Sequence, residues 1–241
     1  MRVCTWNILL GRRLPAVLET VRAHPEFRGL DLFALQEASV HDGRPDAAAI
    51  AEALGPGYLY FQATAQLFRG AEQGNALIWR RGLFEDRAHA VVSLNDFPAP
   101  AMSRTERMLL RAVPPQRRIA IRAESAELRV YVMHLDVMGF TRKLEQFRAI
   151  LTDMAKRPRV PLTIVAGDLN TFGPPRLQLW RGIRAAAHGA GLAELTHGLR
   201  RTHWTGMKLD AIYVRGAVGG AHRAWTLNVR ASDHVPVFAE F

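Results

Sequence analysis

The sequence of 241 residues predicts a mixed α/β fold. Short apolar runs with the length and composition of buried strands recur along the whole chain. Segments with helical periodicity lie between these runs. Hydrophobic residues make up 49% of the chain and charged residues 22%, which is the composition of a globular protein that buries a sizeable core.

The predicted strands are apolar runs that end at polar or turn-forming residues. In chain order they are Arg2–Trp6, Leu30–Leu35, Ala76–Trp79, Ile119–Arg122, Leu128–Leu135, Leu162–Ala166, Leu209–Val214 and Val235–Phe241. No internal repeat and no low-complexity linker divides them. The length alone allows one large domain or two small ones.

The predicted helices carry apolar residues on one face. Leu14–Phe27 is the first, and Asp46–Leu54 is the second, with Asp46 suited to cap it. Thr141–Ala155 and Leu177–Ala190 follow. The apolar stripe of Thr141–Ala155 consists of Leu144, Phe147, Ile150, Leu151 and Met154. The alternation of these helices with the strands indicates the α/β class.

One long segment, Asn95–Arg118, fits neither pattern. It contains four prolines and five arginines, and a short helix is predicted within it at Thr105–Arg111. The segment is either an excursion over the rim of a site, where loops usually carry function, or a solvated connector. The sequence leaves both interpretations open.

The charge balance bears on the kind of partner. A formal net charge of +10 and a pI of about 10.8 favour polyanions such as nucleic acid, anionic lipid or phosphorylated metabolites. Lysine occurs only at Lys143, Lys156 and Lys208, so nearly all the positive charge is arginine, which a GC-rich genome would also produce. The charge therefore suggests a polyanionic substrate without establishing one.

The cellular setting is predicted from features that the sequence lacks. No run approaches the roughly eighteen apolar residues of a membrane span. The apolar part of MRVCTWNILLGRR is too short for a secretory signal. The single cysteine, Cys4, cannot form an internal disulfide. We therefore expect a cytoplasmic protein in a reducing environment, and we expect it to be a monomer.

The stretch VAGDLNT, Val165 to Thr171, ends an apolar run in a carboxylate and an amide two residues apart. If the extended geometry continues through Leu169, Asp168 and Asn170 point to the same side, as the groups of a functional site would. Asp, Asn and Gly are also the usual residues of an ordinary turn. Taken alone, the stretch favours the turn.

Other predicted strands share this feature, because polar side chains stand at their ends. The side chains at these strand ends are those of Asn7, Glu37, His134, Asp136, Asp210, Asp233 and His234. Each one has an ordinary structural explanation, but together they are hard to dismiss. If the strands pack in a sheet, these ends can form one cluster of carboxylates, amides and imidazoles.

Such a cluster has a recognisable chemistry. Oxygen ligands without cysteine favour a hard cation, which is Mg²⁺ or, as alternatives, Mn²⁺ or Ca²⁺. Histidines with a pKa near neutrality can hold or donate protons beside a phosphoryl oxygen. A metal, a carboxylate base and imidazoles around an open face suit the hydrolysis of phosphoesters.

The chain resembles the endonuclease/exonuclease/phosphatase superfamily, which has the deoxyribonuclease-I-like fold. The matching stretches follow the family order along the whole chain. They are TWN at Thr5–Asn7, LQE at Leu35–Glu37, GNALIWR at Gly74–Arg80, MHLD at Met133–Asp136, GDLNT at Gly167–Thr171, LDAIYV at Leu209–Val214 and SDHVPV at Ser232–Val237. GDLNT and SDHVPV are the specific motifs, and the others are weak singly.

The resemblance implies a four-layer αββα sandwich of two packed, mostly antiparallel sheets flanked by helices. It implies one catalytic domain, residues 1–241, with its site at one end of the sheets. Asn7, Glu37 and Asp233 would lie at the metal, with Glu37 as its main ligand.

The resemblance also implies catalytic roles. Asp168 would activate or orient the attacking water, and Asn170 would place that water or bind a phosphate oxygen. Asp210 would orient His234, which would stabilise the transition state. His134 would contact the scissile phosphate or the leaving oxygen. Asp136 has no assured counterpart, and a local structural role remains open for it.

The fold does not select a substrate. A nuclease or phosphodiesterase acting on nucleic acid is the leading hypothesis, because the net charge and the arginines of Asn95–Arg118 suit a phosphate backbone. Arg104, Arg107 and Asn75 are the candidate substrate contacts, and Arg111, Arg117 and Arg118 are further basic candidates. One alternative is a phospholipid or phosphoinositide head-group hydrolase that faces a membrane surface. Another is a non-catalytic polyanion-binding protein of the same fold.

The sequence departs from related patterns at several places. Ala38 and Ser39 follow Glu37, where apurinic-site endonucleases typically have Thr-Lys, and Trp204 stands alone where they carry a tryptophan-rich segment. In the deoxyribonuclease pattern, a glutamate before the GNALIWR-like strand supports the first histidine. Glu72 or Gln73 falls near that place, which puts a proton-donating role of His134 in question.

Overall fold

Two six-stranded sheets lie face to face in the computed structural model, which describes residues 1–68, 70–85, 88–96, 104–112, 116–172, 178–216 and 221–241. In spatial order the first sheet contains β13 (Arg223–Thr226), β14 (Val237–Glu240), β1 (Arg2–Asn7), β2 (Leu32–Ala38), β6 (Ala71–Arg80) and β5 (Tyr58–Phe68). The second contains β11 (Ala193–Glu194), β12 (Asp210–Gly216), β10 (Leu162–Asp168), β9 (Leu128–His134), β8 (Ile119–Glu124) and β7 (His89–Ser93). A small hairpin pairs β3 (Val40–His41) with β4 (Arg44–Pro45).

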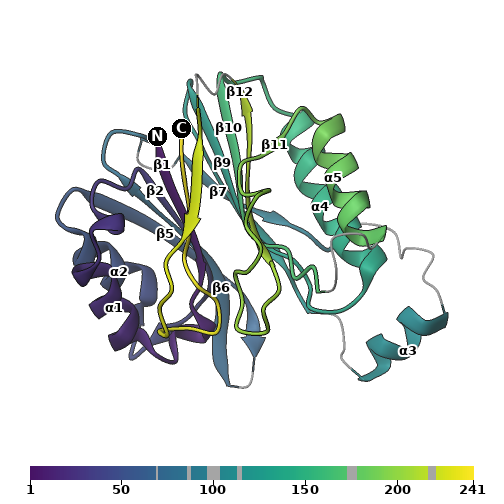
Figure 1. The fold of residues 1–241 in the computed structure, drawn as a ribbon, viewed down its shortest axis with the longest axis horizontal. Coiled ribbons are helices and arrows are strands. Elements are labelled where there is room, and N and C mark those ends of the chain that lie inside the picture. The colour runs from purple at the N-terminus through teal and green to yellow at the C-terminus, as the bar shows by residue number, and fades with distance from the viewer. Residues whose placement is uncertain (69, 86–87, 97–103, 113–115, 173–177, 217–220) are drawn as a thin grey trace.

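Helices cover the outer face of each sheet (Figure 1). The helices are α1 (Leu14–Ala23), α2 (Asp46–Leu54), α3 (Arg104–Ala112), α4 (Phe140–Ala155) and α5 (Gln178–Gly189). α1 and α2 pack on the first sheet, α4 and α5 pack on the second, and α3 stands apart at the lower right of Figure 1. The predicted four-layer αββα sandwich is therefore confirmed.

Strand alternation divides the buried residues into separate layers. Val3 of β1 points into the core between the sheets, whereas Cys4 and Trp6 point toward α1 and α2. Ile164 of β10 likewise faces the core between the sheets, and Val165 packs under α4 and α5. Both faces of the central strands are buried, which explains why the sequence shows them as continuous apolar runs.

The centre of each sheet is a parallel pair of strands. β1 runs parallel to β2, and β9 runs parallel to β10. The remaining ladders of the two sheets, within the described chain, are antiparallel. Parallel neighbours end at the same edge of a sheet, so each central pair delivers two carboxyl ends to one place.

The longest strand, β5, was not predicted from the sequence. Its residues are mostly half-buried or exposed, because β5 is the edge strand of the first sheet. An edge strand contributes fewer apolar side chains to the core, so its apolar pattern is weak.

The end of α1 and the N-cap of α2 differ from the prediction. α1 ends at Ala23, and a separate 3-10 turn follows at Pro25–Phe27. Proline disfavours helical geometry at the preceding residue, here His24, whose φ and ψ are extended. Asp46 was predicted to cap α2, but Pro45 is the N-cap, and the Asp46 carboxylate accepts a hydrogen bond from Ser39 N at 2.7 Å.

In the part of the chain that the structure describes, no helix combines the length and the apolar character needed to cross a membrane.

Candidate active site

The core between the sheets changes from apolar to polar at one end. On the first sheet, Asn7, Gln36 and Asn75 are register neighbours across β1, β2 and β6. On the second sheet, His134, Asp168 and Asp210 are register neighbours across β9, β10 and β12. The site therefore lies near one end of both sheets, where two rows of polar side chains face each other.

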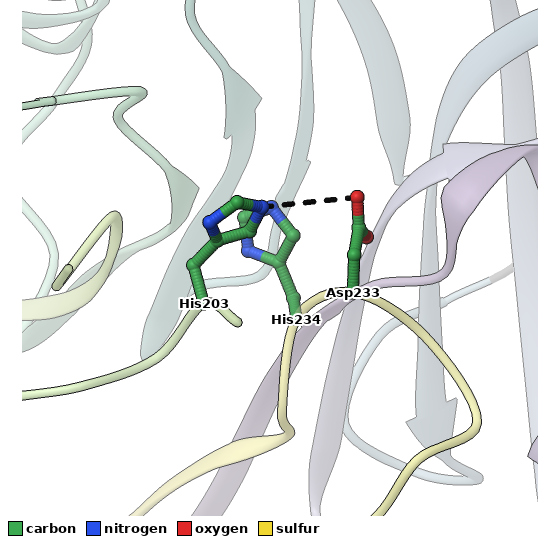
Figure 2. Close-up of side chains that lie close together, drawn as sticks. All are labelled: His203, Asp233 and His234. Carbon is green, nitrogen blue, oxygen red and sulfur yellow. Dashed lines mark ion pairs between the residues drawn. The ribbon is translucent and has the colours of Figure 1, made fainter. Parts of the chain in front are cut away.

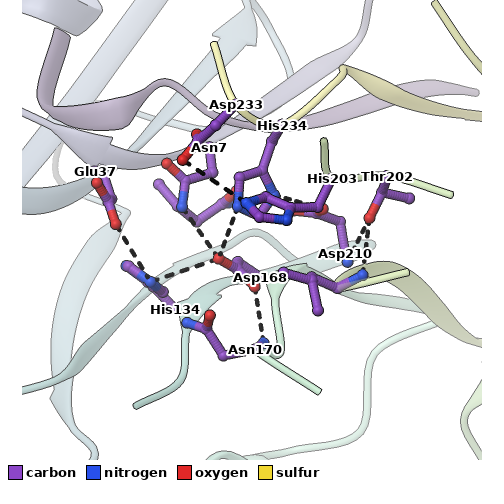
Figure 3. Close-up of polar contacts among 12 residues, drawn as sticks. Asn7, Glu37, His134, Asp168, Asn170, Thr202, His203, Asp210, Asp233 and His234 are labelled. Atoms are coloured by element: carbon purple, nitrogen blue, oxygen red, sulfur yellow. Dashed lines mark hydrogen bonds and ion pairs between the residues drawn. The ribbon is translucent and has the colours of Figure 1, made fainter. Parts of the chain in front are cut away.

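Asp168 is the centre of this cluster (Figure 3). Asn7 Nδ2 donates to its Oδ2 at 3.0 Å, while His134 Nε2 and His234 Nε2 lie 3.6 and 3.7 Å from the same oxygen. Asn170 N donates to its Oδ1 at 2.8 Å. Burial raises the pKa of Asp168 and Asp210 adds to this effect, whereas His234 and the hydrogen bonds oppose it.

The end of β10 and the loop that follows it have a backbone that suits this arrangement. Gly167 has φ +149°, and a Cβ there would lie 1.9 Å from Met133 O, so only glycine allows β10 to approach β9 so closely. Asn170 has φ +49°, and its Nδ2 donates to Leu135 O at 2.9 Å. The amide of Asn170 thus ties the loop to the end of β9.

Glu37 reaches the site through a β-bulge. The pairing of β2 with β6 jumps from Gln36–Asn75 to Ala38–Gly74, which leaves Glu37 unpaired with φ +52°. Bulges next to functional sites re-aim a side chain in this way. The Glu37 side chain is 16% exposed, and its Oε1 lies 3.9 Å from His134 Nε2.

His234 is held by a carboxylate. Its Nδ1 lies 2.8 Å from Asp210 Oδ2, and Trp6 Nε1 donates to its backbone carbonyl at 2.9 Å. Burial alone would lower the pKa of His234, but Asp210 and Asp168 outweigh burial and raise it to about 10. Thr202 supports this pair, because its Oγ1 accepts from Asp210 N at 3.1 Å.

His134 is held by an arginine. Its Nδ1 lies 2.9 Å from Nη1 of Arg118, and both side chains are buried. Burial lowers the pKa of His134 well below its ordinary value, and Arg118 and His234 lower it further. Glu72 and Gln73 engage other partners, since Glu72 accepts from Thr64 Oγ1 and Gln73 accepts from Gln66.

A third imidazole, His203, borders the site (Figure 2). It forms a β-bridge with His234, and the two ring centroids are 4.6 Å apart. Its Nε2 lies 3.8 Å from Asp233 Oδ2, and Nδ1 lies 2.8 Å from Thr205 Oγ1. His203, Asp233 and His234 have ligand atoms within 4.8 Å of one another, as do Asp168, Asp210 and His234.

The oxygen-rich side of the site fits a hard divalent cation. Figure 3 shows Glu37, Asn7 and Asp233 along the side of Asp168 that faces the first sheet. Burial raises the pKa of Glu37 and Arg118 lowers it, while the charges of Asp168 and Asp233 raise it further. Carboxylates and an amide that crowd together without cysteine are donors suited to Mg²⁺.

The candidate substrate contacts have different placements. Asn75 is buried, and its Nδ2 donates to Ile119 O at 2.8 Å, which bridges the two sheets. Arg104 and Arg107 are exposed on α3. Arg118 differs from the other arginines of its segment, because it is only 2% exposed and cannot reach a phosphate backbone from the surface. Within Asn95–Arg118, residues 97–103 and 113–115 lie outside the described chain.

Asp136 has a structural environment. Its Oδ2 accepts from Gln116 N at 3.2 Å and from Arg142 Nε at 2.9 Å, and its own N–H donates to Gln146 Oε1 at 2.8 Å. These bonds join the end of β9 to α4 and to the segment before β8. Of the two interpretations of Asp136, this geometry favours the local structural role.

Sequence reasoning missed Lys143. Its Nζ donates to Asn170 O at 2.5 Å beneath the site, and burial lowers its pKa to about 8 although Asp168 and Asp136 oppose this. A signal was present, since Lys143 shares the helical stripe of Phe147, Ile150 and Met154. A lysine on a buried face indicates a specific partner. No comparable signal pointed to His203 or to the burial of Arg118, which the sequence predicted only as a basic candidate for phosphate binding.

Known structures share this fold. An endonuclease/exonuclease/phosphatase family protein from Bacteroides thetaiotaomicron is 18% identical, with a TM-score of 0.70 over 99% of this chain and 96% of that chain. A mannosyl-6-phosphatase from the same organism is 18% identical, with a TM-score of 0.69 over 100% and 98%. The catalytic domain of human nocturnin with bound sulfate is 20% identical, with a TM-score of 0.67 over 99% and 93%.

Among curated proteins, no sequence matches the chain significantly. The family model described as endonuclease/exonuclease/phosphatase family matches residues 4–234, which include all the strand ends of the site. The name of this family describes enzymes that cleave phosphoester bonds. The chain belongs to the endonuclease/exonuclease/phosphatase family.

Proposed function

We propose that the protein is a divalent-metal-dependent phosphodiesterase that cleaves nucleic acid by in-line attack of water. The observation that carries the proposal is the surroundings of Asp168 Oδ2, where Asn7 Nδ2, His134 Nε2 and His234 Nε2 all lie within 3.7 Å. Nitrogen donors directed at one buried anionic oxygen can meet the negative charge that develops on a phosphoryl group.

The residues of the site have separate roles in the proposed reaction. Asp168 orients the attacking water and takes its proton, and Asn170 holds the loop that follows Asp168. His234 remains an imidazolium because Asp210 holds its Nδ1, and its Nε2 stabilises the pentavalent transition state. His134 donates to a phosphoryl oxygen from the opposite side of Asp168.

Glu37, Asn7 and Asp233 would hold the metal, which we propose to be Mg²⁺. When bound, the cation supplies charge that offsets the negative charge of the transition state. Asn7 also holds the Asp168 carboxylate against the end of β1, because its Oδ1 accepts a hydrogen bond from Leu9 N at 3.0 Å while its Nδ2 donates one to Asp168. Ser232 supports Asp233 through a hydrogen bond of 3.1 Å from Oγ to Oδ1.

Binding of Mg²⁺ should raise the melting temperature. Binding only to the folded state stabilises it by about 2.7 kcal/mol at a free ion concentration of about 100 Kd. For a chain of this size, that corresponds to roughly 5–10 °C. Thermal melts with Mg²⁺ and with a chelator measure the shift.

The matched variant for this measurement is Glu37→Gln, which keeps the side-chain length and removes the charge. The shift should fall to near zero in Glu37→Gln and persist in Glu52→Gln, since Glu52 pairs with Arg44 on the surface. An equal Mg²⁺ shift in wild type and Glu37→Gln would show that Glu37 does not bind the ion.

α3 favours nucleic acid as the substrate. Arg104, Arg107 and Arg111 are exposed and lie at helical spacing on one face, whereas Glu106 faces the body and binds Thr141 N at 2.8 Å. α3 lies between β7 and β8 in sequence. The last residue of β7 pairs with the first residue of β8, and both lie at the end of the sheet that carries the site. A row of exposed arginines on a helix that follows from this end of the sheet suits a phosphate backbone.

Removing two of these charges should weaken binding of single-stranded DNA and flatten its salt dependence. The double variant Arg104→Gln/Arg107→Gln should lower the slope of log K against log salt by about 1.4, since each phosphate contact contributes roughly 0.7. Fluorescence anisotropy at several salt concentrations measures this slope.

A matched control removes two exposed arginines at the opposite end of the strands. In Arg22→Gln/Arg159→Gln the slope should stay close to wild type, because Arg22 lies in the last turn of α1 and Arg159 precedes β10. Equal slopes for both double variants would mean that α3 makes no specific contact with the backbone.

The head-group alternative also has an observation in its favour. Met108 is 66% exposed on the same face of α3 as the arginines. Met108 is one of five apolar residues of Asn95–Arg118 that could form an apolar tip at a membrane, with Phe97, Met102, Leu109 and Leu110; of these, Phe97 and Met102 lie outside the described residues. Basic and apolar side chains together can bind an anionic membrane surface.

A substrate panel tests the proposed function. Single-stranded and double-stranded DNA, RNA, bis-p-nitrophenyl phosphate, phosphoinositide and sphingomyelin are incubated with Mg²⁺, with and without a chelator. We expect chelator-sensitive cleavage of nucleic acid. Cleavage of lipids alone, with flotation on anionic liposomes, would favour the head-group alternative. Metal-dependent binding without any hydrolysis would favour the non-catalytic protein.

A further inference from the structure

The two histidines that face Asp168 are held by partners of opposite chemistry. Asp210 Oδ2 lies 2.8 Å from Nδ1 of His234, and a carboxylate can accept a hydrogen bond there. Arg118 Nη1 lies 2.9 Å from Nδ1 of His134, and a guanidinium can only donate. Nδ1 of His134 must therefore be the acceptor, which leaves the ring proton on Nε2.

Burial and hydrogen bonds hold the Arg118 guanidinium in its position against His134. It is 2% exposed, its Nη2 donates to Gln116 Oε1, and its backbone N donates to Asn95 Oδ1 at 3.0 Å. These contacts fix the direction of the guanidinium at the start of β8. The imidazole of His134 cannot rotate away from the arginine without removing the hydrogen-bond partner of Arg118 Nη1 and of its own Nδ1, which are both buried.

The other ring nitrogen of His134, Nε2, has no such partner in the described chain. This nitrogen is buried, and no described residue forms a hydrogen bond with it. It lies 3.6 Å from Asp168 Oδ2 and 3.9 Å from Glu37 Oε1, which are both beyond hydrogen-bond distance. A buried N–H without a partner is costly, so this proton is available to a ligand oxygen that enters between the two carboxylates.

We propose that Arg118 is a positioning residue that holds His134 as the neutral Nε2–H tautomer. We further infer that His134 donates a hydrogen bond to a non-bridging phosphoryl oxygen and keeps its proton throughout turnover. The catalytic half of this inference rests on the proposed function. His134 then gives no proton to the leaving oxygen, so its contribution does not depend on the basicity of the leaving group.

Nuclear magnetic resonance of the unliganded protein tests the role of Arg118. Long-range ¹H–¹⁵N spectra at neutral pH should show His134 with its proton on Nε2 and a bare Nδ1. In Arg118→Met the ring loses its donor, and the Nδ1–H form should become populated. In Arg122→Met, which removes a buried arginine within β8 that pairs with Asp153, the His134 signals should keep the wild-type tautomer.

An Nδ1–H or doubly protonated His134 in the wild type overturns the inference, and this measurement does not depend on whether Arg118→Met folds. It is equally independent of catalysis. A wild type that hydrolyses no phosphoester would overturn the proposed function, while the tautomer would still decide the role of Arg118.

Kinetics with aryl phosphodiesters that differ in leaving-group basicity test the role of His134. His134→Ala should lose about 10²–10³-fold in kcat for every ester, because one donor is removed. His134→Gln offers an amide N–H near the position of Nε2 and should recover about tenfold or more over His134→Ala. If the loss in His134→Ala grows steadily with leaving-group basicity and glutamine restores nothing, His134 is a general acid and the inference is wrong.

Discussion

Replacing Asp168 by asparagine is expected to reduce phosphodiester hydrolysis by about 10³-fold or more, because it removes the base and the charge at the centre of the site. Asparagine has nearly the same shape, and its carbonyl oxygen can still accept the hydrogen bond from Asn170 N that Oδ1 now accepts at 2.8 Å. The variant should therefore fold. Steady-state kinetics and circular dichroism of the variant measure the two properties separately.

Asp136→Asn is the matched control for this prediction. Asp136 is equally buried, but its oxygens bind Gln116 N and Arg142, which join elements of the fold. Asp136→Asn should lower the melting temperature more than Asp168→Asn does and should keep activity within about tenfold of wild type. If both variants lose the same activity, Asp168 has no special role in the chemistry.

Asp210→Asn is expected to lower turnover by about 10²–10⁴-fold without any contact between Asp210 and substrate. Asp210 raises the pKa of His234 against the effect of burial, and with Asp168 it brings that pKa to about 10. Without the charge of Asp210, the pKa of His234 falls and the imidazolium is lost at a lower pH. The residual activity of Asp210→Asn should therefore decline with rising pH before that of the wild type does, which a pH–rate profile measures.

A double variant separates this support from an independent role. In Asp210→Asn/His234→Ala the activity should be no lower than in His234→Ala alone, because Asp210 acts through the imidazole that is already absent. Losses that multiply in the double variant would mean that Asp210 has its own part in the reaction.

The sequence predicted the central strands well, because a strand buried on both faces is a continuous apolar run that few other structures produce. It also predicted which strands end in polar side chains. The bulge at Glu37 and the left-handed backbone of Asn170 could not be predicted, since both depend on pairing between strands that are distant in sequence. These two features set the directions of the Glu37 and Asn170 side chains. Those directions bring the polar groups at the strand ends together in one site.

Other parts of the site are not visible in local patterns. Arg118 appeared among exposed basic residues of a proline-rich segment, yet it is buried against His134. His203 lies in an isolated bridge that has no strand periodicity. The partners of such residues are set by tertiary packing alone, whereas the helical stripe of α4 did mark Lys143 as buried.

The position of β14 has a consequence for how the cell makes this protein. β14 pairs with β1 and begins three residues after His234, so a strand that is synthesised late completes a sheet that a much earlier strand started. Proteins emerge from the ribosome with the N-terminus first. A nascent chain that still lacks β14 has no strand that places His234 beside Asp210, so the candidate site can form only after β14 has paired with β1.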